Sequence, residues 1–101
     1  MALSLVIHRP DGTGDGADAM RAAVRDAVWE VADTHWAVTE DAMLVSGDLS
    51  PDYLLDHFRR CLARRGFQTT GELLVAAVGP RAAWSGLGGE AEAWLRDALG
   101  G

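Results

Sequence analysis

A chain of 101 residues is long enough for one domain with a single modest core and too short for two such cores. Apolar residues make up 49% of the chain and charged residues 24%, a globular composition that excludes a disordered polymer. The formal net charge of −6 argues against nonspecific nucleic-acid binding and against docking on an anionic membrane. We therefore expect no nucleic-acid partner and no membrane partner.

Residue usage also bears on origin and compartment. All nine basic residues are arginine, which together with abundant Ala, Gly and Asp suggests a GC-rich bacterial coding sequence. The single cysteine, Cys61, cannot form an internal disulfide. The N-terminal residues MALSLVIHRP have no basic segment before the apolar run and no cleavage-site pattern. No apolar run approaches the roughly 20 residues of a membrane span, so we expect a cytoplasmic protein without a secretory signal.

Hydrophobic periodicity predicts seven elements in the order strand, helix, strand, strand, helix, strand, helix. A tight connection at Glu40-Asp41 is expected to join the second and third strands, with a longer loop as the alternative because Glu-Asp is not a favoured two-residue turn. A Gly-rich connector, residues 79–89, precedes the last helix. Together the elements make one domain, with residues 1–78 as its core. The expected bounds are Leu3–His8, about Ala17–Asp33, Thr34–Thr39, Ala42–Ser46, Ser50–Phe67, Glu72–Val78 and Glu90–Leu99.

The clearest signals belong to the helix expected between Ser50 and Phe67. The Ser50 hydroxyl can cap its N-terminus, and Pro51 suits the first helical position because its missing N–H has no partner there anyway. Gly66 can adopt the left-handed conformation that ends a helix. One face is apolar and must pack on another element. Its residues are Leu54, Leu55, Phe58, Cys61 and Leu62.

The first six elements resemble, in topology, the split βαβ or ferredoxin-like arrangement. The resemblance covers residues 1–78 and implies an α+β fold with an antiparallel sheet in the order 4-1-3-2. Right-handed crossovers would place both helices on one face of that sheet. Alternation in the first strand leaves open whether Leu3, Leu5 and Ile7 or the intervening residues face the helices, and both sets contain large apolar residues. The second sheet face therefore needs the last helix or a second copy as a cover.

These features favour a small protein-interaction module that self-associates and acts as a regulator, adaptor or immunity-type protein. Its partner would be a protein or a second copy of the chain, with about even odds for a homo-oligomer. Tryptophans are enriched at protein interfaces, and an arginine pair on the central helix faces outward. The candidate interface residues are Trp29, Trp36, Trp84, Trp94, Arg60 and Arg64.

Two alternatives involve small ligands. A ligand-binding protein or enzyme could use a pocket between the sheet and the last helix, with His8 and His35 as its polar groups. A cation-binding module could use the loop carboxylates of Asp11, Asp15 and Asp18, although the loop lacks the full calcium-loop pattern.

No residue is assigned a catalytic role, and we expect no cofactor. His57 and Cys61 lie four residues apart, the spacing of a nucleophile–base pair on one helix face. Their apolar surroundings favour packing over chemistry, because a buried thiol is usually inert.

Overall fold

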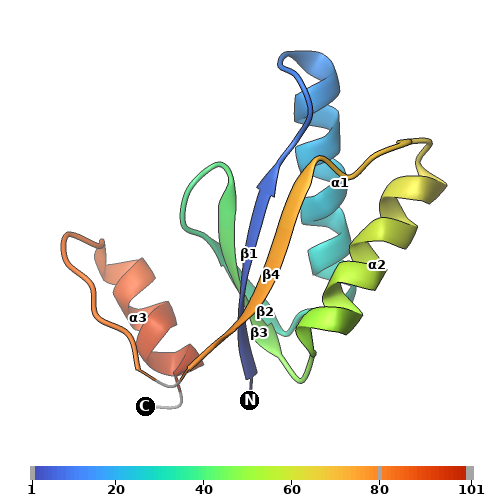
Figure 1. Cartoon of the computed structure of the whole chain (residues 1–101). Coiled ribbons are helices and arrows are strands. Elements are labelled where there is room, and N and C mark those ends of the chain that lie inside the picture. Colours follow the sequence, from blue (N-terminus) through green and yellow to red (C-terminus); the bar gives the residue numbers. More distant parts are fainter. Residues whose placement is uncertain (1, 80, 100–101) are drawn as a thin grey trace.

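The computed structural model describes residues 2–79 and 81–99. All seven expected elements are present in the expected order, and their bounds differ from expectation only near the ends (Figure 1). The elements are β1 (Ala2–Arg9), α1 (Asp15–Val31), β2 (Thr34–Ala37), β3 (Ala42–Gly47), α2 (Pro51–Arg64), β4 (Glu72–Val78) and α3 (Gly89–Ala98).

The strands form one four-stranded sheet in the order β2-β3-β1-β4, with every neighbouring pair antiparallel. Read from the other edge, this is the 4-1-3-2 order, so the α+β ferredoxin-like prediction is confirmed. Helices α1 and α2 cover one face of the sheet, and α3 lies on the other side (Figure 1). The chain is thus built as a helix layer, a sheet and a single outlying helix.

The core lies between the sheet and the α1–α2 layer. Phe58 and Leu54 of α2 are completely buried there, each at 0% exposure. Burial of one such side chain contributes about 1.5–3 kcal/mol. Small residues on α1, such as Ala23 and Ala27, let the two helices approach closely. The core residues are Val6, Met20, Ala23, Val24, Ala27, Val28, Val45, Leu54, Phe58, Cys61 and Leu62.

The strand register decides which residues of β1 face this core. Val6 belongs to the core and is opposite Met43 of β3 and Val75 of β4, which also pack against the core. Because side chains alternate along a strand, Ser4, Val6 and His8 face the helices and Leu3, Leu5 and Ile7 face away. The larger apolar set is therefore the outward one.

The connection between β2 and β3 is longer than expected. The two-residue Glu40-Asp41 turn is wrong, since β2 ends at Ala37 and residues 38–41 form the loop. Val38 and Thr39 both donate backbone N–H groups to the Ala42 carbonyl, at 2.9 and 3.1 Å. Glu-Asp lacks the positive-φ preference of a two-residue hairpin turn, so these bonds close a wider loop instead.

Both predicted ends of α2 are confirmed. Ser50 Oγ accepts a hydrogen bond from the Tyr53 backbone N–H at 3.1 Å, and Pro51 occupies the first turn. At the other end Gly66 has a φ of 90°, in the left-handed region, and Phe67 donates its N–H to the Leu62 carbonyl. These bonds satisfy groups that a helix end otherwise leaves without partners.

Removing the Ser50 cap tests this local account. Ser50→Ala is expected to lower the free energy of unfolding by about 1 kcal/mol, because one N-terminal N–H of α2 loses its acceptor. Ser50→Thr keeps the hydroxyl and should lose much less. Urea unfolding followed by circular dichroism measures both, and equal losses in the two variants would contradict the cap.

Candidate functional site

The sheet face opposite α1 and α2 is apolar along most of its length. In one cross-strand row Leu5 lies between Leu44 and Ala76, and in the next Ile7 lies between Ala42 and Leu74. We call Leu5, Ile7, Leu44, Leu74 and Ala76 the open-face patch. Leu74 is 55% exposed, a high value for a leucine in a sheet. Apolar strand residues that remain in water are typical of an interaction surface.

Helix α3 covers only one end of this face. Trp94 of α3 lies against Trp36 of β2, with ring centroids 6.2 Å apart. Leu95 of α3 and Leu3 of β1 are both buried on this side and belong to no part of the α1–α2 core. The rows nearer the other end of β1 keep partly exposed side chains. The last helix is therefore a partial lid.

The expected space between the sheet and the last helix exists as a cavity of about 500 Å³. His35 and Trp36 line it from β2, and Glu90, Ala91 and Trp94 line it from α3. Its volume and aromatic lining suit a small organic molecule.

The candidate interface residues fall into two groups. Trp36 and Trp94 are in contact, and Trp84 lies beside the same helix, where the Arg96 guanidinium sits 5.4 Å from its ring centroid. Trp29 belongs to α1, on the side of the sheet opposite α3. It is 69% exposed and makes an edge contact with His35, with ring centroids 4.6 Å apart.

The two candidate arginines lie on α2 and have different partners. Arg60 forms an ion pair with Asp56 at 3.1 Å, one helical turn away. Arg64 places Nη2 3.1 Å from the Cys61 sulfur. Each guanidinium contacts a side chain of its own helix, and both residues border one cavity beside Tyr53.

The structure does not bring His8 and His35 together. His8 is opposite Leu73 of β4, whereas His35 is opposite Val45 of β3, which in turn is opposite Ser4. The two histidines therefore lie towards opposite ends of the sheet and cannot act on one ligand.

The surroundings of each of these histidines lower its pKa and so favour the neutral form. Burial lowers the pKa of His8 from its ordinary value of 6.5, and the Arg21 guanidinium of α1 lowers it further. A hydrogen bond from Nε2 to the Thr70 carbonyl at 3.0 Å and the carboxylates of Asp41 and Asp11 act in the opposite direction. Burial and then Arg25 lower the pKa of His35 in the same way.

The three loop aspartates have separate contacts. Asp11 accepts a hydrogen bond from the Thr69 hydroxyl, and Asp18 forms an ion pair with Arg21 at 3.4 Å. Asp15 begins α1, where a carboxylate complements the helix dipole. Each carboxylate thus has a local structural role, and none of these contacts joins one aspartate to another.

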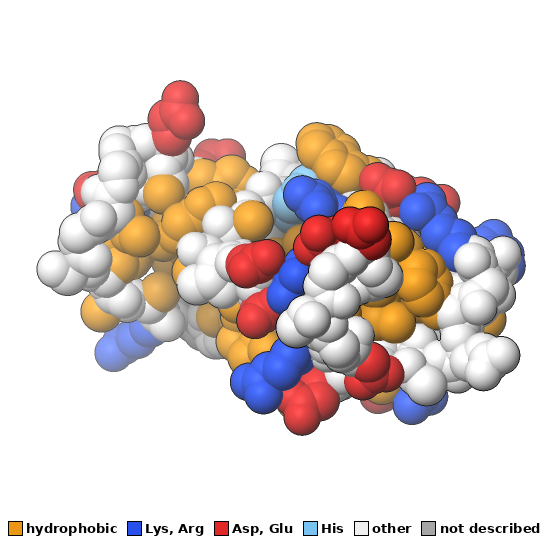
Figure 2. Space-filling view, turned by 90° about the horizontal axis from the view of Figure 1, so that it is seen from above, with side chains coloured by type: hydrophobic (Ala, Val, Ile, Leu, Met, Phe, Trp, Pro, Cys, Tyr) orange, Lys and Arg blue, Asp and Glu red, His pale blue; other side chains and the backbone are white. Residues whose placement is uncertain are grey.

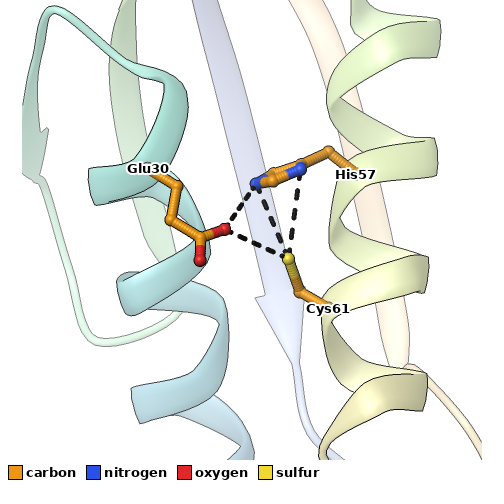
Figure 3. A group of neighbouring side chains, drawn as sticks. All are labelled: Glu30, His57 and Cys61. Atoms are coloured by element: carbon orange, nitrogen blue, oxygen red, sulfur yellow. Dashed lines mark hydrogen bonds and ion pairs between the residues drawn. The ribbon is translucent and has the colours of Figure 1, made fainter.

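A different cluster brings together three chemically active side chains at the seam between α1 and α2. Glu30 of α1 points towards His57 and Cys61 of α2 (Figure 3). His57 Nε2 lies 3.2 Å from Glu30 Oε2 and 3.6 Å from Cys61 Sγ, and Cys61 Sγ lies 3.4 Å from the same Glu30 oxygen. Within residues 2–79 and 81–99, this is the one converging group of three such donors.

The sequence indicates two of the three members of this cluster. The four-residue spacing of His57 and Cys61 is visible in the chain, and both side chains are buried as expected. Glu30 was missed as their neighbour, because it lies 31 residues from Cys61 and meets it only through helix packing. The available signal was its position near the end of α1, which must lie beside α2 in this fold.

Comparisons with protein-family models, with curated proteins and with solved structures give no significant match to this chain. Among the described residues, no helix has the length and apolar character needed to cross a membrane. The residues themselves must therefore carry any functional argument.

The neutral state of His8 predicts a pH dependence of stability. Because its pKa is lower in the folded chain than the ordinary 6.5, the unfolded chain binds more protons below that pH. The free energy of unfolding is therefore highest above the ordinary histidine pKa of 6.5 and falls as the pH decreases. His8→Gln keeps an N–H for the Thr70 carbonyl but does not titrate. We expect it to lose less stability than the parent chain between about pH 7.5 and about pH 5.

Urea unfolding at both pH values measures this difference. His35→Gln is expected to act in the same direction, because burial also lowers the pKa of His35. Identical pH dependence in the parent chain and in His8→Gln would contradict the assignment.

Proposed function

We propose that this chain is a protein-interaction module that pairs with a second copy of itself through the open-face patch. The observation that carries the proposal is the exposure of Leu74 in the apolar Ile7 row of the sheet. A pair of this kind suits a regulator, an adaptor or an immunity-type protein, whose work depends on assembly rather than on catalysis.

The extent of the uncovered surface supports pairing. In the view from above, hydrophobic side chains gather between α3, at the left, and the sheet (Figure 2). Helix α3 reaches the Leu5 row through Trp94 and Trp36, whereas Leu74 in the Ile7 row is 55% exposed to water. Removing such a surface from water is the main favourable term in protein association.

Charge favours a second copy as the occupant. In a twofold pair the same surface is buried on both copies, so an unpaired charge in it would be removed from water twice. The charged residues of the open strand face are Arg9 and Glu72 at its far end, and they neutralise each other in an ion pair at 3.3 Å. A chain of net charge −6 thus presents a nearly neutral face on which two copies can meet.

The pairing surface would also use the outlying helix. Trp36 and Trp94 stand at the border of the open-face patch, and aromatic side chains at such borders stabilise interfaces. The predicted interface role of these tryptophans is therefore kept in the proposal. Trp29, on the opposite layer of the molecule, is left out of it.

Size-exclusion chromatography with light scattering tests the pairing. We expect the parent chain to have twice the mass of one chain, and Leu74→Glu to shift it to the monomer by placing a carboxylate in the apolar row. Because Leu74 is already 55% exposed, the variant should keep its fold, which circular dichroism checks.

Trp29→Glu is the matched control. It makes the same kind of change at an even more exposed apolar residue, on α1, and should leave the pair intact. A parent chain that stays monomeric at every concentration would contradict the proposal. The proposal would also be contradicted if Trp29→Glu separated the pair and Leu74→Glu left it intact.

A further inference from the structure

We propose that Glu30, His57 and Cys61 form a binding site for a divalent transition-metal ion of the zinc class. The site lies at the α1–α2 seam, on the side of the sheet opposite the open-face patch (Figures 1 and 3). It is independent of the pairing proposed above.

The spacing of the three donor atoms fits one ion. Zinc bonds of about 2.0–2.1 Å to nitrogen, about 2.3 Å to sulfur and about 2.0–2.2 Å to oxygen, at tetrahedral angles, separate the donors by about 3.3–3.6 Å. The observed separations are 3.2 Å between nitrogen and oxygen, 3.4 Å between sulfur and oxygen, and 3.6 Å between nitrogen and sulfur. The three atoms therefore lie close enough together to share one ion. Because Cys61 Sγ is 3.6 Å from Nε2 and also 3.9 Å from Nδ1, the sulfur lies over the ring face, and the imidazole must turn for Nε2 to face the ion.

This convergence differs from a catalytic relay. In a nucleophile–base–acid triad the two ring nitrogens of histidine serve different partners, so the three groups lie in a line. Here the same atom, His57 Nε2, is the nearer nitrogen to both Cys61 and Glu30. A triangle of donors is the arrangement of a coordination site.

The donor types select the ion. A thiolate and an imidazole favour zinc and similar metals over calcium or magnesium, which prefer oxygen donors. With Cys61 as a thiolate and Glu30 as a carboxylate, the two protein charges balance those of a divalent cation. The end of α1 also favours a bound cation, since its last turn contains no basic residue to complement the negative end of the helix dipole.

The site has an entrance and room for a further ligand. The Glu30 side chain is 54% exposed, while that of His57 is only 11% exposed, so the ion would enter from the Glu30 side. A cavity of about 670 Å³ adjoins the cluster, lined by Tyr53, Arg60 and Ala63 among others. Three protein donors plus one open position is the pattern of zinc sites that bind water or a substrate.

Ion binding requires two changes of protonation, one at Cys61 and one at His57. The Cys61 thiol must lose its proton to become a ligand. His57 Nε2 lies 3.0 Å from the Ala27 carbonyl, so in the metal-free chain this nitrogen carries the ring proton and donates it there. For Nε2 to bind the ion, the ring proton must move to Nδ1. The binding reaction is therefore visible as a change of histidine tautomer.

Arg64 prepares the sulfur without blocking the site. Its guanidinium donates a hydrogen bond to Cys61 Sγ at 3.1 Å and so helps to orient the sulfur. Arg64 is exposed, so its side chain can move aside into solvent when the ion arrives. It is a positioning group and not a ligand.

Titration of tag-free, chelator-treated protein with Zn²⁺ in a calorimeter tests the site. We expect one ion per chain, with proton release that makes the heat depend on the buffer. Cobalt(II) in place of zinc should give the charge-transfer band of a cobalt–thiolate bond. Glu30→Gln should weaken zinc binding by at least about tenfold, since even an indirect partner of a metal site is worth about 10–100-fold. Cys61→Ser should remove the cobalt band.

Two control variants match these changes. Asp26→Asn removes the same charge one turn earlier on α1, and Ala63→Ser adds a hydroxyl in the same cavity. Both should bind zinc like the parent chain. The absence of zinc binding to the parent chain would overturn the proposal, as would unchanged binding in Glu30→Gln and Cys61→Ser together.

The tautomer gives a readout that needs no variant. Nitrogen-15 spectra of the parent chain should show the His57 ring proton on Nε2 without metal and on Nδ1 with zinc. Binding that leaves the His57 tautomer unchanged would place the ion elsewhere and refute this site. The Leu74→Glu chain should give the same result, which separates failure of the metal site from failure of the pairing.

Discussion

The right-handed crossover is the constraint on which the rest of this structure depends. Each βαβ half must return its helix to the same face of the sheet, so α1 and α2 lie side by side there. That single placement buries Phe58 and Leu54 between the helices and the sheet. It also creates the two features with functional interest, because it closes a helix–helix seam on one side and leaves an apolar sheet face on the other.

Much of the fold was readable from the sequence because its signals are local. The apolar face of α2, the Ser50 cap and the Gly66 end each depend on residues within a few positions of one another, and each is confirmed. The orientation of β1 was not readable, because both alternate sets contain large apolar residues. The core takes the set with Ser4 and His8, and large helix residues such as Phe58 supply the bulk that this set lacks.

The Glu30–His57–Cys61 cluster shows that a site, like the fold, is predicted from the sequence only where its signals are local. His57 and Cys61 share a helix face by spacing alone, so their proximity is a local fact. The third member, Glu30, depends on the rotation of α1 about its axis and on its height beside α2, and both are set by core packing across the sheet. Patterns within one element therefore predict pairs, whereas the chemistry of a site is decided by what a second element adds.

The two proposed surfaces have a geometric consequence when taken together. The open-face patch lies on one side of the sheet and the Glu30–His57–Cys61 cluster lies on the other. In a face-to-face pair the helix layers point outward, so both metal sites stay open to solvent. An ion that joins α1 to α2 tightens a seam that pairing does not touch. Metal binding and self-association would then add independently to stability, because no described contact of one surface is shared with the other.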